Sequence, residues 1–320
     1  MICLFGRNWT RKELEYLIPD PDRLFGIRRV QQIEGNTRGS QTLQVDAGAG
    51  LKVEILLDRS CDIGAVWCDG VPFHWAGPLQ TSFPTSEAVK NTTLYGLMQT
   101  CGFDHIRGAE TVDGKSWPKH GSIINLPANL LTARALWAGD SCIYRIEAET
   151  VMYNLKEGGM KLHRIIEIPL GKREVKIFDE VKIISGNMPI MAMYHANLGF
   201  PFSSEGATLA LDKKDITSKA LDQDGITTHS TDNRKHIARI ISEYGPALDL
   251  EFDGSTFPVL QVLRNFKPGV GLVCLEPATH ERLSRAVLMS EGDLPTVSTG
   301  ESRCFGATFR FYPMGLEQPN

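Results

Sequence analysis

The stretch MKLHRIIEIPLGKREVKIFDEVKIIS, residues 160–185, gives the clearest indication of the fold class. Apolar and polar residues alternate along both of its halves, as they do in a β-strand that buries one face. Gly171 and Lys172 lie between the halves, where a two-residue hairpin turn is expected. The second half places four apolar side chains on one face: Val175, Ile177, Val181 and Ile183. The stretch therefore predicts a long antiparallel hairpin.

The same alternation continues on both sides of this hairpin. QTLQVDAG (residues 41–48) and GLKVEILLD (residues 50–58) predict two strands joined at a Gly-Ala-Gly turn. Later runs such as VGLVCLEPA (residues 270–278) and SRCFGATFRFYP (residues 302–313) extend the pattern to about a dozen strands. We therefore expect a mainly β fold of stacked antiparallel sheets.

One helix is expected, near the start of the chain. Thr10 and Glu13 form a capping box, and Leu14, Leu17 and Ile18 follow at helical spacing. No shift in composition marks a domain boundary, so we expect a single domain over residues 1–320. Its first 40 residues would be a helical and extended lead-in, and residues 41–314 would form the stacked sheets. The polar, turn-rich region 77–118 predicts a long functional loop without strands.

Composition narrows the classes of function. The formal net charge of −4 and the pI of about 6.1 give no reason to expect nucleic acid or an anionic membrane as a partner. The apolar runs are strand-sized, and the start of the chain does not have the pattern of a signal peptide. Seven scattered cysteines without C-x-x-C or zinc-finger spacing predict free thiols, a cytoplasmic location and no metal site.

Three polar positions stand out, although no common catalytic signature such as G-x-S-x-G or H-E-x-x-H is present. His120 precedes a glycine and an apolar strand, and His195 and Asn197 are expected at the end of a strand. Glu276 directly follows Val-Cys-Leu, so it should be partly buried and suited to general-base work. Pro277 should end its strand at the sheet rim. The alternatives are a structural histidine and a rim carboxylate paired with a basic residue.

Taken together, these positions resemble landmarks of the aldose 1-epimerase (galactose mutarotase) superfamily. The landmarks are HGSIINLPA (residues 120–128), YHANLGFP (residues 194–201), CLEPAT (residues 274–279) and the closing TGESRCFGATFRFY (residues 299–312). DRSCDIG (residues 58–64) and TCGF (residues 100–103), the latter expected to form a turn, are similar to the divergent DUF4432-type branch.

This resemblance implies a galactose-mutarotase-like β-supersandwich that binds a sugar and needs no cofactor or metal. Glu276 would remove the proton of the anomeric hydroxyl and His195 would donate one to the ring oxygen, on opposite sides of the hemiacetal. His120 would bind and polarise the sugar. The expected activity is an aldose 1-epimerase, an isomerase, acting as a monomer or homodimer. The alternatives are a non-catalytic carbohydrate-binding protein and an isomerase or epimerase acting at another sugar carbon.

Other residues are expected to contact substrate. Arg59 is a natural bidentate donor to sugar hydroxyls or an anionic group, or else forms a salt bridge with Asp58 or Asp62. Further substrate contacts are expected from Asn197, Asp104 and His105. Typical galactose mutarotases carry an Asn-Arg pair in the loop that TCGFDH replaces here, and a mid-chain carboxylate that grips a hydroxyl. Candidates for that carboxylate are Asp212, Asp215, Asp222 and Asp224.

Overall fold

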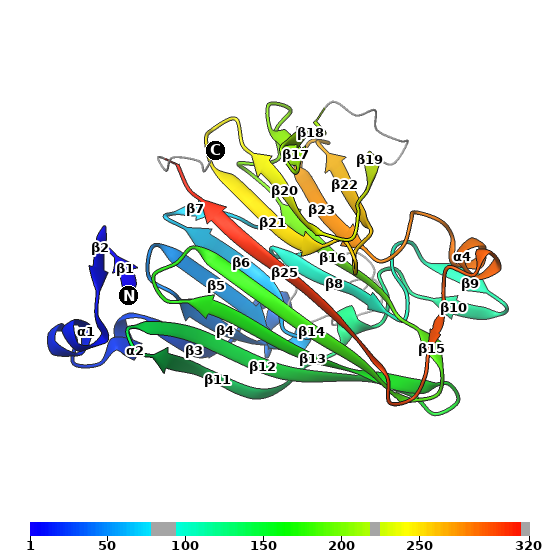
Figure 1. Ribbon diagram of the computed structural model, residues 1–320, viewed down its shortest axis with the longest axis horizontal. Helices are drawn as coiled ribbons and strands as arrows, with labels where there is room; N and C mark the ends of the chain where they lie inside the picture. The colour runs from blue at the N-terminus through cyan, green and yellow to red at the C-terminus, as the bar shows by residue number, and fades with distance from the viewer. Residues whose placement is uncertain (78–93, 218–224, 315–320) are drawn as a thin grey trace.

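Two large antiparallel sheets make up most of the molecule (Figure 1). The computed structural model describes residues 1–77, 94–217 and 225–314. The ten-stranded sheet comprises, in spatial order, β19 (Ile226–Ser230), β22 (Val259–Asn265), β23 (Leu272–Ala278), β16 (Met191–Leu198), β8 (Met98–Phe103), β6 (Asp62–Cys68), β5 (Leu51–Leu56), β4 (Gln41–Asp46) and β3 (Gly26–Gln31), with β7 (Val71–Pro72) beside β6. The nine-stranded sheet comprises β11 (Asn129–Ala138), β12 (Ser141–Asn154), β13 (Gly158–Pro169), β14 (Glu174–Ser185), β25 (Ser302–Tyr312), β21 (Ala247–Asp253), β20 (Lys235–Ile241), β17 (Thr208–Leu211) and β18 (Lys214–Asp215).

Smaller elements flank these sheets. Three short strand pairs are β1 (Ile2–Leu4) with β2 (Arg7–Trp9), β9 (Glu110–Val112) with β10 (Lys115–Trp117), and β15 (Met188–Pro189) with β24 (Thr296–Val297). The helices are α1 (Arg11–Leu17), α2 (Pro21–Leu24) and α4 (Arg285–Glu291), with single 3-10 turns η1 (Gly35–Thr37), η2 (Leu57–Arg59) and η3 (Ile123–Asn125). The described α-helices span seven residues at most, against the roughly 20 that a bilayer crossing requires.

The predicted mainly β fold, its hairpins and the early helix are confirmed. β13 and β14 pair antiparallel across a turn in which Gly171 has a φ of +80°. β4 and β5 pair across the Gly-Ala-Gly turn. At the start of α1 the Thr10 hydroxyl accepts from the Glu13 N–H at 3.2 Å, and the Thr10 N–H donates to Glu13 Oε2 at 2.8 Å. Local alternation and capping were therefore sufficient to locate these elements.

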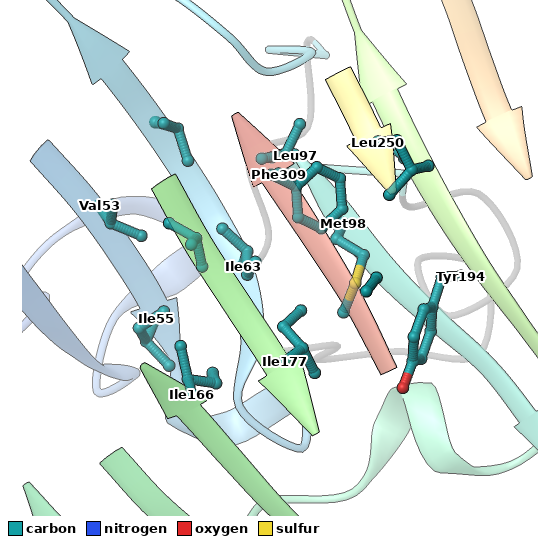
Figure 2. Packing of buried hydrophobic residues seen from close by; sticks show 14 of the residues in the cluster. Val53, Ile55, Ile63, Leu97, Met98, Ile166, Ile177, Tyr194, Leu250 and Phe309 are labelled. Carbon is teal, nitrogen blue, oxygen red and sulfur yellow. The ribbon is translucent and has the colours of Figure 1, made fainter. Parts of the chain in front are cut away.

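The core lies between the two sheets (Figure 2). Most strands of the two sheets contribute alternate residues to it, which is the arrangement expected when sheets stack face to face. Figure 2 shows side chains of the two sheets packed against one another, including Val53, Ile55 and Ile63 from the ten-stranded sheet and Ile166, Ile177 and Phe309 from the nine-stranded sheet.

The prediction of a strand-free loop over residues 77–118 is wrong for the described part of that region. β8, β9 and β10 lie within it, and residues 100–103 (TCGF) belong to β8 rather than to a turn. All six residues of β8 are buried. A strand that is covered on both faces carries no alternation of apolar and polar residues, so the sequence pattern did not identify it. Residues 78–93 lie outside the described ranges.

The prediction that Pro277 ends its strand at a sheet rim is also wrong. β23 continues past Pro277 and lies between β16 and β22, so Glu276 is in the interior of the sheet. Pro277 pairs with Leu260 of β22, whereas the ladder to β16 skips the residues opposite Glu276 and Pro277. Proline has no N–H to donate, so one ladder is interrupted without ending the strand. His195 likewise lies inside β16 rather than at its end.

A further helix, α4, covers part of the outer face of the ten-stranded sheet. The Ser284 hydroxyl caps its first turn by accepting from the Val287 N–H at 3.3 Å, and Gly292 with a φ of +79° ends it. Leu288 of α4 belongs to a small apolar cluster with Met191 and Met193 of β16. Figure 1 shows α4, β9, β10 and β15 gathered at one end of the molecule.

Arg164 of β13 lies between the sheets with its side chain 1% exposed, and all of its N–H groups have acceptors. Nε donates to Asp179 Oδ1 at 2.8 Å and Nη2 to Asp179 Oδ2 at 2.7 Å. Nη1 donates to Asp62 Oδ1 and to the Ser60 carbonyl, both at 3.0 Å. Nη2 also donates to Thr100 Oγ1 at 2.7 Å. The guanidinium thus joins β13 and β14 of one sheet to β6 and β8 of the other.

Electrostatics favour the charged form of this guanidinium. Burial on its own would lower the pKa of Arg164, but Asp179 and Asp62 outweigh burial and raise it. The hydroxyl of Tyr194 also donates to Asp179 Oδ2 at 2.7 Å, and burial together with Asp179 raises the pKa of Tyr194 well above its usual value. The network therefore holds one cation and two carboxylates in the core, and both carboxylates are hydrogen-bonded to the shared cation.

Replacing Arg164 with methionine should lower the free energy of unfolding by about 3–5 kcal/mol, because Asp62 and Asp179 would remain buried without their cation. Urea denaturation followed by circular dichroism measures the change. Arg145→Met is the matched control, since Arg145 pairs with Glu167 at 3.1 Å but is 32% exposed. It should cost less than about 1 kcal/mol. Equal losses in the two variants would contradict the assigned role of the network.

Candidate functional site

Four polar side chains form a row across neighbouring strands of the ten-stranded sheet. Gln261 of β22 is paired with Glu276 of β23, and Gln99 of β8 is paired with His195 of β16. The register of β16 on β23 places His195 opposite Glu276. Tyr194 faces the core, so His195 faces the outer side of the sheet. The row is buried: His195 and Glu276 are each 3% exposed.

His195 and Glu276 are in direct contact within this row. Nε2 of His195 lies 3.3 Å from Oε1 of Glu276, and Nδ1 lies 2.7 Å from Oδ1 of Asn197. The Cys274 thiol also donates to Asn197 Oδ1, at 3.5 Å. The acid and base named from the sequence therefore lie side by side on adjacent strands, not on opposite sides of a gap as expected.

These contacts constrain where hydrogen atoms of the pair can lie. An amide oxygen can only accept, so Nδ1 of His195 carries a hydrogen toward Asn197. Nε2 and the Glu276 oxygen would then face each other as two acceptors unless one proton lies on either of them. Oε1 of Glu276 has no hydrogen-bond partner among the described residues, and neither does Nδ2 of Asn197. The pair can therefore share one proton and retain capacity for a ligand.

His120 approaches His195 from the loop that follows β8. The two rings are 5.3 Å apart between centroids in an edge-to-face arrangement. His120 has a φ of +62°, and Gly121 has a φ of +78°. A side chain at Gly121 would lie 2.3 Å from the carbonyl oxygen of His105 and 2.5 Å from that of Gly102, so only glycine fits there. The glycine of the His-Gly pair is thus required by the backbone.

His120 is half-buried, and its Nδ1 atom is buried without a hydrogen-bond partner among the described residues. Burial of the ring, followed by the positive charges of His195 and Lys119, lowers the pKa of His120 well below its usual value. The ring is therefore neutral at pH 7, and it can donate or accept a hydrogen bond without carrying charge.

Arg107 belongs to the site, and the sequence reasoning missed it. With the side-chain oxygen of Gln261 turned toward the guanidinium, that oxygen accepts from Arg107 Nε at 2.9 Å and from Nη2 at 2.6 Å. Nη2 also donates to the carbonyl of His280. Burial lowers the pKa of Arg107 to about 10, while the charge of Glu276 favours its cation. Arg107 therefore places a positive charge close to Glu276. Its φ of +69° marks a strained loop position.

Arg59 reaches the row indirectly. Its Nη2 donates to Gln99 Oε1 at 2.6 Å, and its side chain is buried. Burial lowers its pKa, and the charge of Asp62 opposes that shift. Asp62 is bound to Arg164, and Asp58 accepts from the Gln41 N–H at 2.6 Å. The structure therefore places Arg59 behind Gln99.

Asp104 and His105 support the loop rather than the row. The Asp104 carboxylate accepts from the N–H and hydroxyl of Ser122, at 2.9 and 2.5 Å. His105 is 1% exposed, and its Nε2 lies 2.7 Å from the carbonyl of Gly108. Among the described residues, neither forms a hydrogen bond or an ion pair with His195 or Glu276. Both hold the segment that carries His120.

The mid-chain carboxylate stays unassigned. Asp212 accepts from His236 and Arg234, each at 2.7 Å, next to the nine-stranded sheet. Asp215 accepts from the Thr217 N–H at 2.8 Å and is exposed. Asp222 and Asp224 lie outside the described residues.

A metal could be held by three groups of the row. Ligand atoms of His195, Cys274 and Glu276 all lie within 4.8 Å of one another, and all three residues are buried. Burial raises the pKa of Cys274 well above its usual value, with the charge of Glu276 adding to the effect. A thiol that keeps its proton and donates to Asn197 is a poor metal ligand, because thiolates are the coordinating form. The donor set fits acid–base work better.

Acidification should destabilise the protein through its buried histidines. Burial lowers the pKa of His105, of His120 and, to about 4, of His280. The unfolded chain, with histidine pKa values of about 6.5, then binds protons that the native state does not. Stability is therefore constant above that value and falls as the pH drops below it, by up to about 1.4 kcal/mol per pH unit for each histidine. Urea denaturation between pH 7.5 and 5 measures the slope.

His280→Gln is the matched variant, because it removes one titrating group and leaves intact the backbone carbonyl that binds Arg107. Below pH 6.5 its free energy of unfolding should fall less steeply with pH than that of the wild type. The slopes should differ by up to about 1.4 kcal/mol per pH unit, the contribution of one histidine. Identical slopes in the two proteins would contradict the buried, neutral state assigned to His280.

Known proteins of similar structure share this architecture. A candidate aldose 1-epimerase from Klebsiella pneumoniae superimposes with a TM-score of 0.77 at 18% identity, over 89% of this chain and 83% of that one. A galactose mutarotase-like protein from Clostridium acetobutylicum gives 0.63 at 16% identity, over 91% and 99%. A galactose 1-epimerase from Lactobacillus acidophilus gives 0.58 at 12% identity, over 90% and 99%. At such identities the likeness establishes the fold.

Sequence comparison identifies the branch. No curated protein matches this chain in sequence. The family model described as a domain of unknown function, DUF4432, matches residues 37–237, more than half of the chain. The mutarotase-like fold and the divergent branch expected from the sequence motifs are thereby confirmed. The chain belongs to the DUF4432 family and has the β-sandwich fold of the galactose mutarotase-like proteins.

Proposed function

We propose that the protein is an aldose 1-epimerase that interconverts the α and β anomers of an aldose or a modified aldose. The observation that carries this proposal is the buried contact of 3.3 Å between His195 Nε2 and Glu276 Oε1. An imidazole and a carboxylate that share one proton can take a proton from one oxygen while giving one to another. The two oxygens of a hemiacetal are bonded to one carbon, so an adjacent acid and base suit them. The names of the structural neighbours support the same reaction.

The reaction can be written with these two groups alone. The Glu276 carboxylate takes the proton of the anomeric hydroxyl, and the protonated His195 donates from Nε2 to the ring oxygen. The electrons of the broken O–H bond form the carbonyl, and those of the C1–O5 bond form the new hydroxyl. After rotation about C1–C2, His195 takes its proton back as the ring closes on the other face. Glu276 returns its proton to O1, so the pair ends as it began.

The neighbouring residues support these roles. Asn197 fixes the tautomer of His195 by accepting from Nδ1. Arg107 offsets the negative charge of Glu276 in a buried setting. His120, neutral and with Nδ1 unpartnered among the described residues, is suited to bind a sugar hydroxyl beside His195. Arg59 orients Gln99 at the end of the row.

The test is exchange NMR on a panel of neutral and anionic aldoses, with and without the protein. Glu276→Gln and His195→Ala should each lower the rate of anomer exchange by at least about a hundredfold, the usual contribution of a general acid or base. His163→Ala is the matched control: His163 bonds Glu147 at 2.8 Å on the partly exposed face of the nine-stranded sheet, and its loss should leave the rate unchanged. Near wild-type rates in both site variants would refute the assignment.

The same experiment separates the alternatives. The unpartnered buried atoms of Asn197 and His120 also suit a carbohydrate-binding protein without catalysis. Sugar binding measured by calorimetry, with no acceleration of exchange for any sugar, would favour that function. Signals beyond those of the two anomers would indicate an isomerase or epimerase that acts at another carbon.

A further inference from the structure

A cavity of about 980 Å³ lies beyond the loop that carries His120. It is formed where β10 and α4 meet the ends of β12, β13 and β15, at the end of the molecule where Figure 1 shows these elements together. Its volume is at the upper end of the range of small-molecule sites. The charged residues of its lining are Asp104, Lys115, Glu157 and Arg285, and the aromatic ones are Trp117 and Tyr153.

Arg285 is held at this cavity by several contacts. Its side chain is buried, with the residue 4% exposed, and its guanidinium carbon lies 3.7 Å from the centre of the Trp117 ring. Nη1 donates to the Asp104 carbonyl at 2.7 Å and lies 3.1 Å from the sulfur of Met191. The hydrogen bond from Nη1 therefore holds the guanidinium over the indole ring of Trp117.

The other edge of this guanidinium is free. Nε and Nη2 have no hydrogen-bond partner, and no carboxylate lies within ion-pair distance of Arg285, among the residues that the structure describes. Both oxygens of the Asp104 carboxylate are engaged by Ser122. Nε and Nη2 present two parallel N–H groups, which is the geometry that binds two oxygens of one anionic group.

Two of the other three charged residues of the cavity compensate each other. Lys115 forms an ion pair with Glu157. Its Nζ atom also lies over the Trp117 ring, 3.7 Å from the ring centre. The four charged lining residues sum to zero in formal charge, two basic and two acidic. Selectivity for an anion would therefore come from the fixed fork of Arg285 and not from an overall positive field.

We propose that this cavity is a second ligand site, which binds a small organic anion of sugar-acid or sugar-phosphate size through the Nε–Nη2 edge of Arg285. The site is distinct from the His195–Glu276 pair. Met191, which contacts Arg285, precedes His195 by four residues on β16, or about 13 Å at the usual rise of a strand. The apolar cluster that contains Met193 and Leu288 borders the same strand.

The first experiment is calorimetry on the full-length protein with D-gluconate, D-glucose 6-phosphate and D-glucose. Saturable binding of at least one of the two anions is expected, and excess D-glucose should not displace it. Comparing the affinities of D-gluconate and D-glucose 6-phosphate shows whether the site prefers a carboxylate or a phosphate. The absence of saturable binding for both anions would overturn the proposal. Binding of the preferred anion should persist in Glu276→Gln, and its loss there would overturn the separation of the two sites.

Variants then assign the site. Arg285→Lys keeps the charge but removes the fork, and it should weaken binding of the preferred anion at least tenfold. Asn187→Trp changes an exposed lining residue and should weaken binding by filling the cavity without disturbing the fold. Arg234→Lys, at an exposed position outside this cavity, is the matched control and should bind like the wild type. Unchanged binding in Arg285→Lys, or in Asn187→Trp if the first variant does not fold, would overturn the proposal.

Discussion

One buried guanidinium, that of Arg164, ties the two sheets together, and the geometry of the candidate site depends on it. It binds Asp179 within its own sheet and Asp62 and Thr100 in the other. Thr100 directly follows Gln99 on β8, and Tyr194, which donates to Asp179, directly precedes His195 on β16. Alternate residues of a strand face opposite sides of a sheet. The inner faces of β8 and β16 are thus fixed by the network, and their outer faces carry Gln99 and His195.

The network also explains the motif DRSCDIG at residues 58–64. Its three charged residues make separate contacts within the fold. Asp62 binds Arg164, Arg59 donates to Gln99 of β8, and Asp58 accepts from the backbone of β4. A contact of Arg59 with a substrate stays a prediction. A motif with this many charges suggests a binding site. Buried charged residues can also have a structural role when each has a hydrogen-bonding partner.

The parts of the structure that follow from local pattern could be predicted from the sequence. Alternation located the β13–β14 and β4–β5 hairpins, and a capping box located α1. The site was predicted in part: His195, Asn197, Glu276 and His120 do come together, although the resemblance to a family suggested the set. Cys274 and Gln261 were missed because strand pairing between segments distant in the chain brings them to the site. Arg107 was missed because it reaches Gln261 from the segment between β8 and β9. β8 was missed because it is buried on both faces. One signal was available and unused: Arg164 and Asp179 interrupt the buried faces of the hairpin at directly paired positions.

The loop that follows β8 connects the two places where ligands would bind. On one side it carries Arg107 and His120 over the row that contains Glu276 and His195. On the other side Asp104 and Ser122 line the cavity of Arg285. Typical galactose mutarotases place an Asn-Arg pair in this region, and Arg107 supplies a cation here from a position further along the loop. A side chain at Gly121 would collide with the carbonyl oxygens of His105 and Gly102, so the turn packs closely against the start of the same segment. The turn thus carries His120 to His195 on one side, and on the other its Ser122 binds both oxygens of the Asp104 carboxylate, which leaves Arg285 bound to the Asp104 backbone carbonyl.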